Sequence, residues 1–138
     1  MKLDDITGTI IDCAIRIHID LGPGLLESVY ETLLAKALEK RGLKVRRQYP
    51  IRFVYDGVQF DEGSRADLFV EDQVLVELKS VEKLAEVHKK QTLTYVKLLN
   101  LSIGLLINFG APTLKQGLIR VVNSLVPATS SRLRVNQP

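Results

Sequence analysis

The chain has 138 residues, of which 46% are hydrophobic and 25% charged, a length and composition that predict one globular domain. A single cysteine excludes an intramolecular disulfide and a zinc site built from several thiolates, and the net charge of +3 permits a polyanionic partner without indicating one. Because the first residues lack an apolar signal segment and no apolar run approaches the roughly 20 residues of a membrane helix, we expect a cytoplasmic protein with no membrane partner.

Two helices are predicted at the start of the chain. The first covers residues 3 to 20, where apolar side chains recur at spacings of three and four. The second runs from about Leu25 to Arg41 and ends at Gly42, a residue type common just after helices. Its predicted apolar stripe consists of Leu26, Val29, Leu33, Leu34, Ala37 and Leu38.

After Gly42 the period of the apolar pattern changes from 3.6 to about 2, which predicts strands. Asp56-Gly57 is a strong signal for a tight hairpin between two of them. The predicted strands are Val45–Tyr49, Ile51–Tyr55, Val58–Asp61, Ala66–Val70 and Val74–Val81.

The second half of the chain predicts a helix followed by a buried strand. The helix runs from about Glu82 to Leu99, and the continuous apolar run Leu101–Phe109 is typical of a strand covered on both faces. Leu118–Val122 is expected to form a short strand or helix. This order predicts one α/β domain over residues 1–126, in which helices pack on a mixed sheet, and a disordered tail over residues 127–138.

The segment 66–80 contains the residues that are candidates for catalysis and metal binding. Since side chains alternate along a strand, Glu77 and Lys79 share one face with Leu75. If the turn comprises residues 71 to 73, Asp67 lies directly opposite Glu77 on the neighbouring strand, whereas a two-residue turn would place Asp67 opposite Val76.

Two opposed carboxylates repel each other, and a divalent cation between them would remove that repulsion. Oxygen ligands of this kind suit Mg²⁺ or Mn²⁺, which also accept phosphate oxygens of a substrate. Lys79 could orient a water and stabilise developing negative charge. The alternative is an Asp–Lys or Glu–Lys cross-strand pair without an ion, and the hairpin alone leaves both interpretations open.

Five cations fall within eight residues between positions 40 and 47. One interpretation is a solvated helix end and edge strand. The other is contact with a phosphate backbone, in which Lys44 and Arg46 bind the substrate.

Several motifs resemble the PD-(D/E)XK nuclease superfamily. Asp67 followed ten residues later by Glu77-Leu78-Lys79 is similar to its signature, and Gly24 to Tyr30 matches G-x-x-E-x-x-Y, the motif of the GxxExxY family within it. The segments Gly63-x-Arg65-x-Asp67 and Gly104–Phe109 also match that family, and Gln91-x-x-x-Tyr95 resembles a motif of RecB-type nucleases.

The resemblance implies a restriction-endonuclease-like fold, with an αβββαβ core preceded here by an extra helix. It implies a Mg²⁺- or Mn²⁺-dependent hydrolase of phosphodiester bonds in DNA or RNA. Asp67, Glu77 and Glu27 would hold the metal, and Tyr30 and Arg65 would contact the substrate. The catalytic set that it implies is Glu27, Asp67, Glu77, Lys79, Gln91 and Tyr95.

A second class of function stays open. The chain could be a nucleic-acid-binding or partner-binding module that keeps the nuclease fold without turnover, a reading that the modest net charge favours weakly. The intact Asp67, Glu77 and Lys79 favour the nuclease. The sequence leaves open whether the chain acts as a homodimer or beside a larger protein partner.

Overall fold

The central sheet of the computed structural model has five strands, in the spatial order β1-β4-β5-β6-β7. Only β5 and β6 run parallel, and the other neighbours are antiparallel. The strands are β1 (Val45–Pro50), β4 (Arg65–Val70), β5 (Val74–Lys79), β6 (Ile103–Asn108) and β7 (Leu118–Val122). The structure describes residues 1–61, 63–124 and 133–135.

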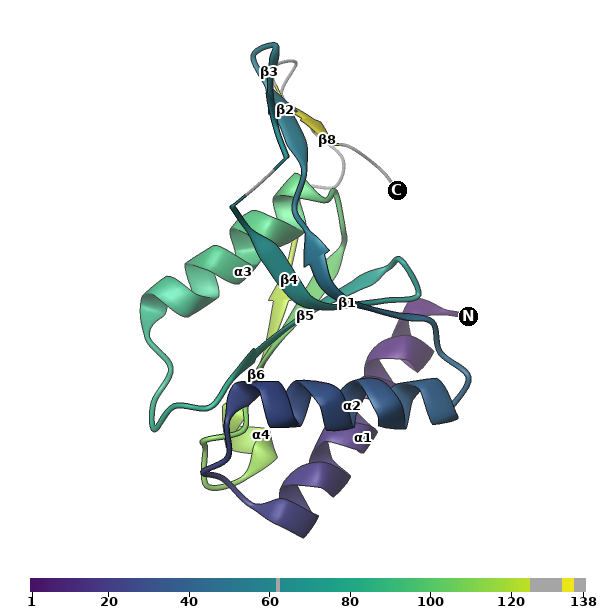
Figure 1. Cartoon of the computed structure of the whole chain (residues 1–138), viewed down its shortest axis with the longest axis vertical. Coiled ribbons are helices and arrows are strands. Elements are labelled where there is room, and N and C mark those ends of the chain that lie inside the picture. Colours follow the sequence, from purple (N-terminus) through teal and green to yellow (C-terminus); the bar gives the residue numbers. More distant parts are fainter. Residues whose placement is uncertain (62, 125–132, 136–138) are drawn as a thin grey trace.

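Helices cover both faces of this sheet. The helices α1 (Leu3–Leu21) and α2 (Glu27–Lys40) share one apolar core with alternate residues of the strands, together with the short α4 (Leu114–Gly117). The helix α3 (Glu86–Leu98) packs on the intervening residues from the other side (Figure 1). The elements α2, β1, β4, β5, α3 and β6 confirm the predicted αβββαβ core, and α1 is the extra helix before it.

The apolar stripe predicted for α2 needs correction, and the buried face of α3 is set by the structure. In α2, Leu26 precedes the helix and is 74% exposed, whereas Tyr30, Leu34, Ala35 and Leu38 are buried. In α3, Val87 is 64% exposed, and Thr92, Tyr95 and Val96 are buried. Both helices carry more apolar residues than one face can hold, so the packing partners decide which residues are buried.

A second, smaller sheet lies at one end of the molecule, beyond the end of α3 (Figure 1). Its hairpin joins β2 (Phe53–Tyr55) to β3 (Val58–Phe60), as Asp56-Gly57 predicts, and both turn residues have positive φ. The strand β8 (Leu133–Val135) pairs with β2. The sequence predicts a disordered tail over residues 127–138. Of these, the structure describes only residues 133–135, which form this strand, and the rest of the prediction falls outside the described residues.

The turn between β4 and β5 has three residues, because Val70 pairs with Val74. Glu71 and Asp72 both adopt left-handed φ values of 53°, which non-glycine residues rarely do. The start of β1 holds them there. The Lys44 backbone N–H donates to Glu71 Oε2 at 2.6 Å, and Arg46 Nε donates to Asp72 Oδ1 at 2.9 Å. This contact between distant segments fixes the register of β4 against β5.

Gly110 lies against the backbone of Val81, just after the end of β5. The side chain of Asn108 also bonds this backbone, because its Oδ1 accepts the Val81 N–H and its Nδ2 donates to the Val81 carbonyl. A Cβ atom at Gly110 would lie 2.1 Å from the Val81 carbonyl oxygen. We expect Gly110→Ala to lower the free energy of unfolding by about 2–3 kcal/mol, because backbone atoms have to move. Urea denaturation measures this effect.

Gly8 provides the matched control, since a Cβ there meets nothing within 4 Å and the residue lies inside α1. Gly8→Ala should therefore raise stability by about 0.5–1 kcal/mol. Equal unfolding midpoints for the wild type and Gly110→Ala would show that the close approach at Gly110 is unimportant.

Candidate active site

The strands β4 and β5 stop pairing at Leu68 and Val76, and two carboxylates lie where the ladder ends. The Asp67 backbone N–H donates to Glu77 Oε1 at 3.1 Å, and the Leu78 backbone N–H donates to Asp67 Oδ2 at 2.7 Å. Each carboxylate thus accepts a backbone N–H of the opposite strand. The register predicted from a three-residue turn is confirmed, and it brings Asp67 and Glu77 together.

Lys79 lies two residues after Glu77 on the same strand. Leu75 belongs to the core beneath α3, so strand alternation puts Glu77 and Lys79 on that face as well. The positive charge of Lys79 acts to lower the pKa of Glu77. Its ammonium group forms no ion pair within the part of the chain that the structure describes, which leaves it able to meet an anionic ligand.

Burial makes the carboxylate pair costly to ionise. Glu77 is only 5% exposed, and burial, together with the charge of Asp67, raises its pKa to about 8. Burial also raises the pKa of Asp67, although the hydrogen bond from the Leu78 N–H opposes that shift. A cation beside both groups would favour their charged forms, so the donor chemistry of this site fits a divalent metal with oxygen ligands.

Glu27 is the first residue of α2 and is exposed. Its charge contributes a small part of the raised pKa of both Asp67 and Glu77, so it lies within electrostatic reach of the pair. Among the described residues, no group of three or more His, Cys, Asp or Glu side chains is close enough to hold a metal. The two strand carboxylates are therefore the direct ligand candidates, and Mg²⁺ commonly binds through one or two carboxylates plus waters and phosphates.

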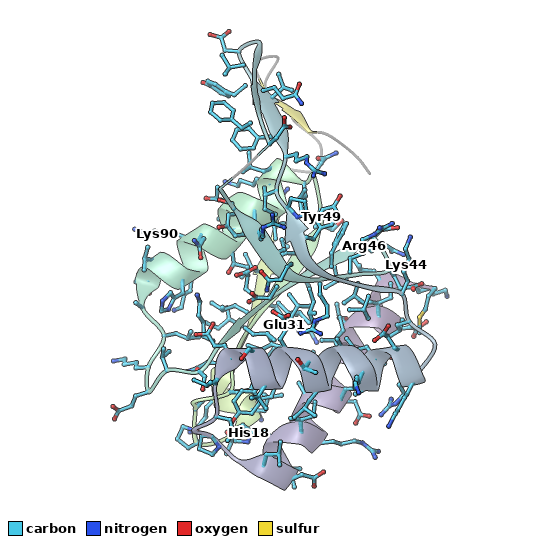
Figure 2. The ribbon with its side chains drawn as sticks, viewed as in Figure 1. His18, Glu31, Lys44, Arg46, Tyr49 and Lys90 are labelled. Carbon is cyan, nitrogen blue, oxygen red and sulfur yellow. The ribbon has the colours of Figure 1, made fainter. Side chains whose placement is uncertain are left out.

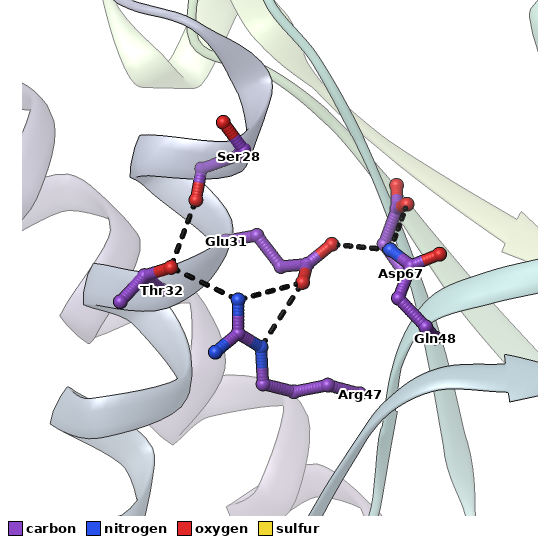
Figure 3. Close-up of polar contacts among 6 residues, drawn as sticks. All are labelled: Ser28, Glu31, Thr32, Arg47, Gln48 and Asp67. Carbon is purple, nitrogen blue, oxygen red and sulfur yellow. Dashed lines mark hydrogen bonds and ion pairs between the residues drawn. The ribbon is translucent and has the colours of Figure 1, made fainter.

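Glu31 and Gln48 also belong to this site (Figure 3). The side-chain Nε2 of Gln48 donates to Glu31 Oε1 at 2.6 Å and to Asp67 Oδ1 at 3.3 Å. Neither residue was singled out from the sequence as a site residue. The available signal was weak: Glu31 lies one helical turn after Glu27 on the same face, and nothing local marks Gln48.

Gln91 and Tyr95 lie one turn apart on α3, as their spacing predicts. Tyr95 is buried against Phe69 and Leu75, on the sheet face that carries Glu77 and Lys79, whereas Gln91 is exposed. The structure therefore places the α3 turn that carries them over the sheet face of Glu77 and Lys79. It gives neither of them a hydrogen bond to Asp67 or Glu77.

The placement of Tyr30 argues against the predicted contact with substrate. Its side chain is fully buried, and its ring stacks on Phe109 with centroids 4.3 Å apart. Its hydroxyl donates to the Gly22 carbonyl at 2.6 Å and accepts the Leu25 N–H at 3.2 Å. Tyr30 thus fixes the loop between α1 and α2, which presents Glu27.

Arg65 is exposed and lies two residues before Asp67. Its Nη1 donates to the Gln48 backbone carbonyl at 3.1 Å. This contact supports the backbone beside the carboxylates and leaves the rest of the guanidinium open to solvent. A contact with substrate at Arg65 is compatible with this placement.

Lys44 and Arg46 lie next to each other on the right of the view (Figure 2). Both are paired with Asp72, at 3.0 Å for Lys44 and 2.9 Å for Arg46, and these bonds lower the pKa of that carboxyl. Arg41 and Arg47 pair with Asp12 and Glu31. Much of the basic run is thus engaged by acids of the chain itself.

Comparison with known proteins gives one match. A family model described as the PD-(D/E)XK nuclease superfamily matches residues 4–121. No curated protein and no solved structure matches the chain. Within the described residues, no helix has both the length and the apolar character needed to cross a membrane.

Proposed function

Because the chain belongs to the PD-(D/E)XK nuclease superfamily, we propose that it is a metal-dependent nuclease that hydrolyses phosphodiester bonds of DNA or RNA. The observation that carries this proposal is the carboxylate pair Asp67 and Glu77 at the end of the β4–β5 ladder, with Lys79 nearby, whose ammonium forms no ion pair among the described residues. A purely structural cross-strand ion pair would engage that lysine.

We assign the roles as follows. Asp67 and Glu77 hold Mg²⁺ or Mn²⁺, and Glu27 lies in or just outside the ligand set. When bound, the cation supplies Lewis acidity to the scissile phosphate and to the attacking water. Lys79 orients that water and stabilises the negative charge that develops on the phosphate. Gln91 and Tyr95 line the same sheet face, and Arg65 contacts the substrate backbone.

We further propose that the chain is a member of the GxxExxY family. The motif runs from Gly24 to Tyr30, and two of its residues have separable tasks in the structure. Tyr30 locks the loop before α2 through its hydroxyl, and Glu27 is the first residue of that helix, within electrostatic reach of the carboxylates. The motif thus supports the position of an acid at the metal site.

Metal binding is the most direct test. We expect calorimetric titration of the native wild type to show Mn²⁺ binding and Asp67→Ala to show none, with Mn²⁺-dependent cleavage of labelled DNA or RNA lost in parallel. The matched control is Asp61→Ala, which removes an exposed carboxylate from the end of the β2–β3 hairpin. Equal Mn²⁺ binding by the wild type and Asp67→Ala would remove the basis of the proposal.

The substrate contacts predicted at Lys44 and Arg46 can be tested separately. Because both cations share Asp72, a phosphate contact has to compete with an existing ion pair. We expect the double variant Lys44→Ala/Arg46→Ala to lower stability by about 0.5–1 kcal/mol and to leave the salt dependence of nucleic-acid binding unchanged. A slope that flattens by about one unit per residue would instead establish both as phosphate contacts.

A further inference from the structure

The backbone of Gln48 departs from the regular strand at the level of Asp67. The register of β1 against β4 would pair these two residues, yet it is interrupted between the pairs Arg47–Leu68 and Tyr49–Ala66. Gln48 has a φ of 50°, an uncommon and strained value for a residue with a side chain. The interruption therefore lies beside the proposed metal ligand.

Because Gln48 and Asp67 do not pair, their backbone groups form hydrogen bonds with side chains instead. The Gln48 carbonyl accepts Arg65 Nη1, and the Asp67 N–H donates to Glu77. The side-chain amide of Gln48 is then placed between two carboxylates, with Nε2 donating to both Glu31 and Asp67. An amide nitrogen only donates, so it suits a position between two acceptors.

Glu31 anchors this amide to α2. It is only 7% exposed, and its Oε2 accepts Arg47 Nε at 3.0 Å and pairs with Nη2 at 2.9 Å. Arg47 Nη2 also donates to Thr32 Oγ1, which in turn donates to the Ser28 carbonyl on the same helix (Figure 3). Arg47 thus compensates the buried charge of Glu31 and fixes its other oxygen toward Gln48.

We propose that Gln48 is a positioning residue, whose amide fixes the orientation of the Asp67 carboxylate and is itself anchored by Glu31 of α2, which Arg47 of β1 holds in place. Asp67 Oδ2 accepts the Leu78 N–H and Oδ1 accepts the Gln48 amide, so both oxygens are directed before any ligand arrives. Hydrogen bonds of this kind around a metal ligand hold it in place and strengthen metal affinity. The inference rests on the proposed function, because it concerns the same metal site.

The test replaces Gln48 with glycine and measures the Mn²⁺ affinity of the folded protein by calorimetry. Glycine accepts a positive φ without strain, so Gln48→Gly removes the amide while tolerating the backbone conformation. We expect its Mn²⁺ affinity to fall about 10- to 100-fold. The matched control is Gln59→Gly, which removes an exposed amide that donates to Asp61 on the hairpin, and its affinity should stay within about twofold of the wild type.

A second variant tests the same role if Gln48→Gly does not fold. Gln48→Asn keeps the amide and tolerates left-handed φ, but its side chain is one methylene shorter and reaches Asp67 and Glu31 less well. It should also weaken Mn²⁺ binding, whereas a purely structural role would lower the melting temperature and leave the affinity of the folded protein unchanged.

The outcomes separate the inference from the proposed function. In the first case, the wild type binds Mn²⁺ and Asp67→Ala does not. Unchanged Mn²⁺ affinity in a folded Gln48 variant would then overturn the role of Gln48 and leave the proposed function standing. A wild type that binds no Mn²⁺ would overturn both.

Discussion

Replacing Lys79 with methionine is expected to lower the rate of Mn²⁺-dependent cleavage about 10²- to 10³-fold while the protein stays folded and still binds nucleic acid. Methionine keeps most of the aliphatic stem and removes the charge. Since the ammonium of Lys79 has no ion-pair partner within residues 1–61, 63–124 and 133–135, its loss breaks no salt bridge there. Single-turnover cleavage and thermal melting measure the two quantities.

The same variant separates the nuclease from a non-catalytic binding module. In a module without metal, Lys79 would act only as a counter-charge that favours ionised Glu77, so its removal would lower the melting temperature at and above pH 8, where Glu77 ionises. Lys97→Met, on the exposed side of α3, is the control for loss of one surface charge. Two results together would count against the nuclease: a wild type that shows no Mn²⁺-dependent cleavage of DNA or RNA, and a Lys79→Met variant that is destabilised.

Replacing Glu77 with glutamine should stabilise the metal-free protein, and increasingly so as the pH rises. The pKa of Glu77 is raised from 4.5 to about 8, so the folded state disfavours its ionised form. The protonated carboxyl supports folding fully below about pH 4.5, and that contribution is lost as the pH rises toward 8. Glutamine does not titrate, so the difference in stability should grow to several kcal/mol, at about 1.4 kcal/mol per pKa unit.

Thermal melts in a chelator between pH 5 and pH 8 measure this difference. Mn²⁺ should reverse the order at pH 8, because binding to the native state raises the melting temperature of the wild type and Glu77→Gln lacks a ligand. Glu39→Gln, at an exposed position of α2, should follow the wild type throughout. A gap between Glu77→Gln and wild type that does not change with pH would mean that Glu77 is not strained by burial.

Local signals in the sequence determined most of the elements. The change from a 3.6-residue to a two-residue period placed the helices and strands to within a few residues. Asp56-Gly57 determined the hairpin, because a type I′ turn needs two residues that accept positive φ. The alternation along β5 put Glu77 and Lys79 on one face, because successive side chains of a strand must point to opposite sides.

The register that unites Asp67 with Glu77 was left open by the sequence, since turns of two and three residues were both compatible with the pattern. Tertiary contacts decided it. Glu71 and Asp72 adopt uncommon left-handed conformations, and Lys44 and Arg46, from a distant segment, bond to them there. The basic run that suggested a phosphate contact is therefore part of what stabilises the site's geometry.

The surroundings of the carboxylates were likewise decided by packing. The sequence predicts Leu26 for the apolar stripe of α2 and Tyr30 for contact with substrate, yet Leu26 is exposed and Tyr30 is buried against Phe109. Glu27 and Glu31 share one helical face, yet only Glu31 meets Arg47 and Gln48 and is buried. The sequence by itself determined which residues form each strand and helix, because those preferences are local. The tertiary structure decided which acids are buried together, because their partners lie on segments that only the fold brings into contact.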